Sequence, residues 1–292
     1  MRVVGSLGSL MGMVVLLLAL PARGVEPMVV RHNLFADANN KTLNYKGEVL
    51  ALILEKSKAK YGPYVMLPGS QQAWSQRRAY NELEHGDLDL MTSQTSIARE
   101  KSSLPIRYCL YKGLLGIRIG MGAPAIVEKM NRVTSREQLN QVKLGQVSDW
   151  PDYAIQTAAG LQVTSLTSVE SSLPRLLLGT FELLPLGVVE VEPIAKRYNL
   201  KTVSTWAIAY PTAYYFFVNR KRPELAQRLE YGFEQAIKDH SFDRLFARRI
   251  EPLIASSKLE NRQLFRIANP LLPPETPLHR KELWHPLIAG GL

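Results

Sequence analysis

The fold of this chain is indicated by a short phrase that occurs twice, as NELEHGDLDLM at residues 81–91 and as PRLLLGTFELL at residues 174–184. Each copy reads as the end of a helix, a glycine just after it (Gly86 or Gly179), and an acidic residue that leads into a short apolar strand. Equivalent helix–glycine–strand junctions in two halves of an α/β chain predict two lobes. A cleft between such lobes is a place for a small ligand.

Residues 1–24 have the pattern of a secretory signal peptide. Arg2 supplies a basic start, residues 3–20 are apolar or small, and Pro21 breaks the run ahead of small residues at the predicted cleavage site. A transmembrane anchor is the alternative interpretation, although no other stretch is long enough to span a bilayer. No cysteine lies near the cleavage site, so a lipoprotein anchor is not expected. We therefore expect the mature protein to be exported.

The net charge of the chain limits the classes of partner that we expect. Removing the predicted signal peptide takes away Arg2 and Arg23 and no acidic residue, so the net charge falls from +10 to +8. This excess favours anions in general, but the basic residues are dispersed and the location is extracytoplasmic, so we expect no nucleic-acid partner.

The single cysteine, Cys109, excludes an internal disulfide and lies in an apolar run. We expect it to be a buried structural thiol.

The segments alternate between strand and helix from residue 28 to residue 91. The first helix is predicted by a one-sided apolar stripe, which consists of Val49, Leu50, Ile53, Leu54 and Ser57. This order predicts a parallel sheet with crossover helices.

A second set of strands and helices begins near residue 114, and the aromatic segment 210–219 is placed to bring the chain back to the first lobe. The predicted organisation is a signal peptide at 1–24, a first lobe at 25–112 and 207–268, a second lobe at 113–206, and a proline-rich tail at 269–292.

Several segments carry a resemblance to the extracellular solute-binding proteins of family 3. They are Lys46-Gly47-Glu48 before the first helix, the helix–Gly–Asp–strand–Thr–Arg segment at 83–99, and the closing pair of helices at 219–246. The resemblance covers residues 28–249 and implies the type-2 periplasmic binding fold. This fold is α/β with two lobes, each a mainly parallel sheet flanked by helices. Two hinge crossovers are expected, near 111–113 and 207–212.

The resemblance also implies a ligand site at the positions Trp74, Thr92, Ser93, Thr95, Arg99, Gln146, Ser148, Trp150 and Glu182. An arginine fork matches a carboxylate in two hydrogen bonds, and neighbouring hydroxyls satisfy its remaining lone pairs, which is the role implied for Arg99. The alternative is that Arg99 pairs with Glu100 at the surface.

The other implied roles come from the second lobe and from the start of a first-lobe helix. The loop at 145–150 opens onto a helix N-terminus, where free amides favour an anionic group. Glu182 is the match for an acid that holds a ligand ammonium, and Trp74 for a ring that stacks on the ligand. Structural roles for Trp74, Trp150 and Glu182 are the alternatives.

Nothing in the sequence assembles into a catalytic centre. A Gly-x-Ser-x-Gly turn and a glycine-rich phosphate loop after the first strand are both absent from the sequence. The histidines are scattered without metal-ligand spacing, at His32, His85, His240, His279 and His285. We expect no enzymatic activity, no metal and no cofactor.

The expected function is therefore a monomeric periplasmic solute-binding protein. It would capture a small polar or anionic, amino-acid-like solute in the interlobe cleft and deliver it to the inner-membrane permease of an ABC importer. The alternative is a periplasmic sensory or interaction module that keeps the fold without transport. Three features depart from the family pattern: the apolar segment at 181–187, the first-strand loop with Phe35, and the proline-rich tail. The apolar segment and the tail suggest this alternative.

Overall fold

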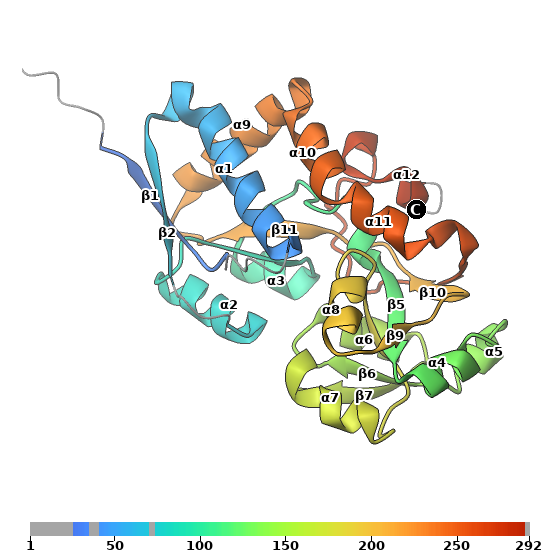
Figure 1. Cartoon of the computed structure of the whole chain (residues 1–292). Coiled ribbons are helices and arrows are strands. Elements are labelled where there is room, and N and C mark those ends of the chain that lie inside the picture. Colours follow the sequence, from blue (N-terminus) through green and yellow to red (C-terminus); the bar gives the residue numbers. More distant parts are fainter. Residues whose placement is uncertain (1–25, 35–40, 70–73, 290–292) are drawn as a thin grey trace, which may run out of the picture.

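The computed structural model describes residues 26–34, 41–69 and 74–289 and shows two α/β lobes joined along one side (Figure 1). The predicted signal peptide at 1–24, the loop with Phe35 and the last residues of the tail lie outside these ranges. Among the described helices, none combines the length and the hydrophobicity needed to cross a membrane.

The first lobe is built on a five-stranded sheet of order β2-β1-β3-β11-β4. Its strands are β1 (Met28–His32), β2 (Tyr64–Pro68), β3 (Leu90–Gln94), β4 (Leu104–Ile106) and β11 (Tyr214–Val218). Its helices are α1 (Lys41–Tyr61), α2 (Gln76–His85), α3 (Ile97–Ser102), α9 (Pro223–Lys238) and α10 (Ser241–Arg249). Strand β1 pairs in parallel with β2 and β3, whereas β11 returns antiparallel to β3 and β4. Figure 1 shows α1, α9 and α10 on one side of this sheet and α2 and α3 on the other.

The predicted apolar stripe of the first helix is confirmed. Val49, Leu50, Ile53 and Leu54 are fully buried and form part of the main core. Helix α9 lies directly against α1 at this stripe. Gly232 makes the close approach possible, because a Cβ there would stand 2.1 Å from the carbonyl oxygen of Ile53.

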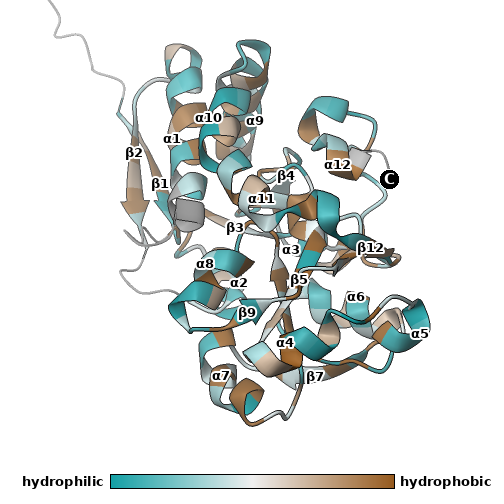
Figure 2. Ribbon diagram, turned by 45° about the vertical axis from the view of Figure 1, so that its right-hand side comes forward, coloured by the Kyte–Doolittle hydropathy of each residue, from teal (hydrophilic) through white to brown (hydrophobic). Residues whose placement is uncertain are grey.

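The second lobe contains a sheet of order β12-β10-β5-β8, with β9 beside β5, and a separate pair of strands, β6 and β7. Its strands are β5 (Ile117–Gly122), β6 (Lys143–Val147), β7 (Gln162–Leu166), β8 (Leu184–Gly187), β9 (Lys201–Thr202), β10 (Trp206–Ala209) and β12 (Gln263–Arg266). Its helices are α4 (Pro124–Met130), α5 (Arg136–Leu139), α6 (Pro151–Ala158), α7 (Val169–Leu177) and α8 (Val191–Arg197). In the ribbon of Figure 2, α5 and α8 are coloured largely as hydrophilic residues, as expected for helices with a solvent-facing side.

The second sheet is mixed rather than mainly parallel, which corrects the expectation for this lobe. Strand β5 runs antiparallel to β8, β9 and β10, whereas the pairs β6–β7 and β10–β12 are parallel. The reason is topological. The chain enters the lobe along β5 and leaves it along β10, so these neighbouring strands must run in opposite directions.

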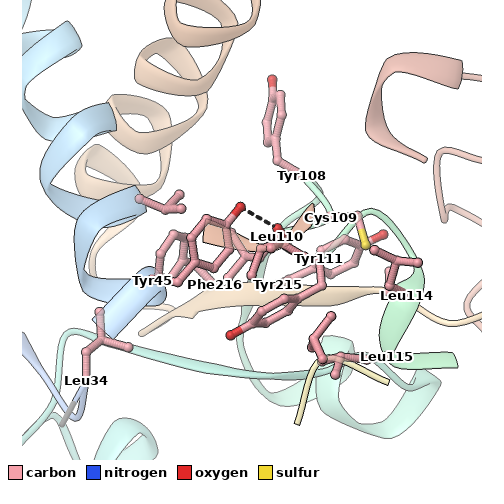
Figure 3. Packing of buried hydrophobic residues seen from close by; sticks show 14 of the residues in the cluster. Leu34, Tyr45, Tyr108, Cys109, Leu110, Tyr111, Leu114, Leu115, Tyr215 and Phe216 are labelled. Carbon is pink, nitrogen blue, oxygen red and sulfur yellow. Dashed lines mark hydrogen bonds between the residues drawn. The ribbon is translucent and has the colours of Figure 1, made fainter. Parts of the chain in front are cut away.

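The first crossover passes through the protein core. Cys109, Leu110 and Tyr111 are buried there, and the hydroxyl of Tyr45 donates to the carbonyl oxygen of Leu110 at 2.8 Å (Figure 3). Cys109 is the buried thiol that the sequence predicts, and burial raises its pKa to about 11. Its sulfur accepts a hydrogen bond from the backbone N–H of Gly113 at 3.1 Å.

The predicted lobe boundaries need one correction. Most of β10 and all of β12 fall in the range 207–268 that was assigned to the first lobe, yet both strands pair in the second sheet. A third segment of chain, which contains α11 (Glu251–Ser257) and the short turn η2 (Leu259–Asn261), therefore also crosses between the lobes. Sequence patterning does not reveal this, because β12 contributes few apolar residues of its own.

The proline-rich tail packs across both crossovers. It contains η3 (Lys281–Leu283) and α12 (Pro286–Ala289), while the turn η1 (Leu114–Gly116) belongs to the first crossover. The side-chain amide of Asn269 donates to the carbonyl of Pro211 at 2.8 Å, and the backbone N–H of His285 donates to the carbonyl of Lys112 at 2.9 Å. Trp284, within the tail, is buried, and its ring lies against Gly113 of the first crossover. The tail thus fastens the two segments about which the lobes would move.

Candidate functional site

Both copies of the repeated phrase form the predicted junction. Gly86 caps α2 with φ of 99°, and Gly179 follows α7 with φ of 74°, both in the left-handed region that favours glycine. The acids of the two copies, Asp89 and Glu182, precede β3 and β8 and so lie at the amino ends of these strands. Ligands of open α/β sheets bind outside the carboxyl ends. The phrase thus positions the strands of the cleft, while its acids lie away from it.

The two acids have structural partners. Asp89 is 1% exposed and accepts from Arg31 Nη2 at 2.8 Å and from Arg222 Nη1 at 2.7 Å. Burial acts to raise the pKa of Asp89, but hydrogen bonds from Arg31 and the charge of Arg222 outweigh it, so the pKa is lowered. Glu182 accepts from the backbone N–H of Lys143 at 2.9 Å. Glu182 is thereby held at the amino end of its strand and does not line the interlobe cavity described below.

The lobes are fastened across the cleft by contacts to Asp149. Arg99 Nη2 donates to the carbonyl oxygen of Asp149 at 2.7 Å, and its Nη1 donates to Ser93 Oγ at 2.5 Å and to the carbonyl of Gln94 at 2.9 Å. Arg77, on α2, donates to Asp149 Oδ1 from Nη2 at 2.6 Å and from Nε at 3.0 Å. We refer to Arg77, Arg99 and Asp149 as the latch. Arg99 points toward the second lobe, but it binds protein atoms there.

The alternative partner of Arg99 is engaged elsewhere. Glu100 accepts from Arg107 Nη2 at 2.5 Å and from the hydroxyl of Thr95 at 2.6 Å. Thr95, one of the hydroxyls that the resemblance implies for the ligand, is thereby held within its own lobe. Thr92 is buried in β3.

The first-lobe residues closest to the cleft are connected through α2. The hydroxyl of Ser93 donates to Gln76 Oε1 at 3.1 Å. Trp74, just before this helix, stacks on the guanidinium of Arg78, with the Arg78 Cζ 4.7 Å from the ring centroid. Trp74 does not line the interlobe cavity described below. The ring therefore packs against its own helix.

Two backbone amides of the turn at 145–150 are engaged within the second lobe. The N–H of Ser148 donates to the carbonyl of Leu166, and that of Trp150 donates to the carbonyl of Val147, both at 3.0 Å. Pro151, at the first position of α6, has no N–H to offer. Ser148, Trp150 and Pro151 therefore have no N–H to offer to an anion.

Gln146, from the same turn, is buried in the second lobe. Its amide donates to the carbonyl of Pro185 at 3.2 Å and its Oε1 accepts from the N–H of Val147 at 2.9 Å. It thus links β6 to β8 and does not reach the cleft.

A small polar cavity lies between the lobes. It is lined by Gln76, Gln94 and Tyr214 of the first lobe, Leu115 of the first crossover, and Arg118, Trp150, Asp152 and Glu190 of the second lobe. Its volume is about 50 Å³, room for about four water molecules at 10–15 Å³ each. Of the implied site residues, Trp150 lines this cavity directly.

Arg118 and Asp152 form the electrostatic centre of the cavity. Arg118 lies on β5, and its Nη2 stands 2.5 Å from Asp152 Oδ1, with side-chain exposures of 3% and 2%. The hydroxyl of Tyr210 donates to the same carboxylate oxygen, and Gln94 Oε1 accepts from Arg118 Nη2 at 3.2 Å. Burial acts to lower the pKa of Arg118, but the charge of Asp152 and further groups outweigh it, so the pKa is raised. The guanidinium stays charged.

Two hydrogen-bond donors in the cavity wall lack partners within the described part of the chain. They are Arg118 Nε and Gln94 Nε2, and both residues are 3% exposed. Glu190 adds a carboxylate whose pKa is raised by burial, against the opposing charges of Arg118 and Lys46. Gly187 leaves room for it, since a Cβ there would stand 2.9 Å from Glu190 Oε2. The cavity thus offers free donors beside an acidic acceptor.

Sequence reasoning missed Arg118, Asp152 and Glu190, although two of them left a signal. Arg118 is a charged residue in the middle of an apolar strand, and such a residue is buried only with a partner. Glu190 follows the carboxyl end of β8 much as Arg99 follows that of β3. Glu190, which follows β8, is therefore a better candidate for a ligand contact than Glu182, which precedes this strand. The residues that the structure describes contain no cluster of three or more metal-ligating side chains.

No protein-family model matches the chain. No curated protein matches it either. Several solved structures are similar to the chain.

One is a periplasmic binding protein of Salmonella typhimurium with high arginine specificity, with a TM-score of 0.57 and 10% identity over 76% of this chain and 99% of that one. A probable amino-acid ABC transporter binding protein of Bacillus subtilis gives 0.56 and 14% over 77% and 98%. An ancestral amino-acid-binding protein, described as a precursor of cyclohexadienyl dehydratase, gives 0.53 and 14% over 78% and 96%.

These likenesses show the fold. The chain has the two-lobed α/β fold of the amino-acid-binding periplasmic proteins, so the resemblance to solute-binding proteins of family 3 is confirmed at the level of fold. It spans nearly the whole of each of these structures, while part of this chain extends beyond the match.

Proposed function

We propose that this chain is a periplasmic solute-binding protein, without enzymatic activity, that captures a small polar or anionic, amino-acid-like solute between its lobes. The observation that carries the proposal is the interlobe cavity, because charged and amide side chains from both lobes face it. A ligand that touches both lobes only in the closed state stabilises closure, which is how such a cavity captures a solute.

The similar structures support the same role. The Salmonella typhimurium protein is a periplasmic binding protein, and the Bacillus subtilis protein is a probable ABC transporter component. We propose accordingly that the chain is exported through residues 1–24, acts as a monomer, and delivers its solute to an inner-membrane ABC permease. Nucleic acid has no part in this role.

The alternative of a sensory or interaction module loses its main support in the structure. The apolar segment at 181–187, which suggested a partner surface, is largely core, with Phe181, Leu183, Leu184 and Leu186 at most 1% exposed. The tail, which also suggested it, packs across the chain's own crossovers. Solute binding is the function that the geometry favours.

Native mass spectrometry of the mature protein, purified from its own periplasm, tests the proposal. A small ligand that co-purifies and leaves on mild activation is the expected result, and its mass would name it. The same protein, dialysed free of ligand, should gain thermal stability with that compound in proportion to the logarithm of its concentration. Absence of any co-purifying ligand, together with no stabilisation by a broad panel of polar solutes, would overturn the proposal.

A further inference from the structure

We propose that the ligand is a short zwitterion, with a carboxylate and an ammonium one or two carbons apart, and that it is recognised by Arg118, Gln94 and Glu190 rather than by Arg99. This inference rests on the proposed function and concerns the same cavity. The carboxylate would accept from Arg118 Nε and Gln94 Nε2, and the ammonium would donate to Glu190.

The free donors are the first argument. Arg118 Nε and Gln94 Nε2 are buried polar groups for which no partner exists among the described atoms, although most buried donors in proteins are satisfied. Gln94 is held in place because its Oε1 accepts from Arg118 Nη2 at 3.2 Å, and its amide nitrogen remains without a partner in the wall of the cavity that both residues line. An acceptor with two oxygens, such as a carboxylate, would satisfy both donors.

The charge of the cavity is the second argument. Asp152 already neutralises Arg118, with the two groups 2.5 Å apart, so the cavity has little net positive charge with which to hold a simple anion. Glu190 adds a further acidic group on the wall. A ligand ammonium that donates to Glu190 would favour its ionised form against burial, whereas an anion alone would bring a further negative charge beside this carboxyl group.

The latch is the third argument. Arg99 donates from Nη1 to Ser93 Oγ and to the carbonyl of Gln94, and from Nη2 to the carbonyl of Asp149. Both nitrogens therefore already have protein acceptors. Arg77 covers the same residue with two hydrogen bonds to its carboxylate. The cavity, whose lining residues Gln76 and Trp150 adjoin Arg77 and Asp149 of the latch, has a volume of about 50 Å³, room for about four water-sized groups. A long cationic or amide side chain would not fit without opening the latch.

Calorimetric titration of the ligand-free protein with glycine, β-alanine, acetate, methylammonium and L-lysine tests this inference. Glycine or β-alanine should bind at one site, at least about tenfold more tightly than acetate, methylammonium or L-lysine, because only the short zwitterions satisfy both the donors and Glu190. Glu190→Gln should weaken binding of the zwitterion by about tenfold or more and leave acetate within about threefold. Gln94→Met should weaken both, since it removes a donor of the carboxylate.

Glu182→Gln is the matched control, because the same change is made to an acid that lies outside the cavity. It should leave every affinity unchanged. Circular dichroism and the melting temperature establish that each variant is folded.

The outcomes separate this inference from the broader function. If L-lysine or another long solute binds as tightly as glycine, or if Glu190→Gln folds and binds glycine as the unaltered protein does, the short-zwitterion site is refuted while solute binding stands. If neither these probes nor a broad panel of polar solutes binds, both proposals fall.

Discussion

The substitution Asp152→Asn should destabilise the protein through a single buried charge. Asp152 is paired with Arg118 at 2.5 Å, and both side chains are at most 3% exposed. Asparagine keeps the size of the side chain and an oxygen to accept from Tyr210, so the main loss is the negative charge. Because an arginine cannot be neutralised by deprotonation, the guanidinium would remain buried and charged.

The magnitude follows from the geometry. Removing one partner of a buried ion pair costs about 3–5 kcal/mol in general. Glu190 lines the same cavity and offsets part of the charge of Arg118, so we expect the lower end, about 3 kcal/mol. For a domain of this size, about 2–4 °C is lost per kcal/mol, so the melting temperature should fall by about 6–12 °C.

Urea unfolding at pH 7, with calorimetry for the melting temperature, measures this change. Asp149→Asn is the matched control. Asp149 is paired with Arg77, whose side chain is 72% exposed, so loss of this ion pair should lower the free energy of unfolding by less than about 1 kcal/mol. The double variant Arg118→Met with Asp152→Leu removes both charges and should recover most of the lost stability. A loss below about 1 kcal/mol for Asp152→Asn would refute the view that this pair is buried and isolated from solvent.

Two further predictions concern the rest of the fold. Asp89→Asn should cost about 1–2 kcal/mol at pH 7, because charge-assisted hydrogen bonds to Arg31 and Arg222 are lost while these arginines, 42% and 25% exposed, remain solvated. The folded pKa of Asp89 is lowered from 3.8, so its contribution is present above this value and is lost as the pH falls through the folded pKa. The gap between the variant and the unaltered protein should therefore shrink below about pH 4 in urea unfolding, and an equal gap at both pH values would contradict the assignment. Trp284→Ala should cost about 3–5 kcal/mol, more than Trp74→Ala at a half-buried position, and equal melting temperatures for the two variants would contradict the packing of the tail.

The sequence was sufficient to predict the two-lobed α/β fold because its signals are local. The glycines after α2 and α7 adopt the left-handed conformation that ends a helix, and the stripe from Val49 to Leu54 faces the core. The position of β12 was not predictable in this way. Its placement depends on pairing with β10, more than fifty residues earlier, as shown by Trp206 opposite Gln263. Long-range pairing leaves little trace in local patterning.

The candidate site was predicted less well, because its residues act through contacts between the lobes. The resemblance identified Arg99 as a residue that reaches across the cleft, but its partner there, the carbonyl of Asp149, belongs to the other lobe. The partner of Arg118 could not be read from sequence either. Asp152 lies on another element, α6, and becomes its counter-ion only when α6 docks beside β5.

The latch changes which ligands the cleft would favour. For a ligand that binds only the closed state, the apparent affinity is the intrinsic affinity multiplied by the fraction of protein that is closed before the ligand binds. Hydrogen bonds from Arg77 and Arg99 to Asp149 raise this fraction without any ligand. One exposed ion pair contributes up to about 1 kcal/mol, and a hydrogen bond from a charged group to a carbonyl contributes about 1.5–3 kcal/mol. A solute small enough to lie beneath the latch would gain from this preorganisation, whereas a longer one would have to break these contacts first. The same side chains that hold the lobes together would therefore select for short ligands.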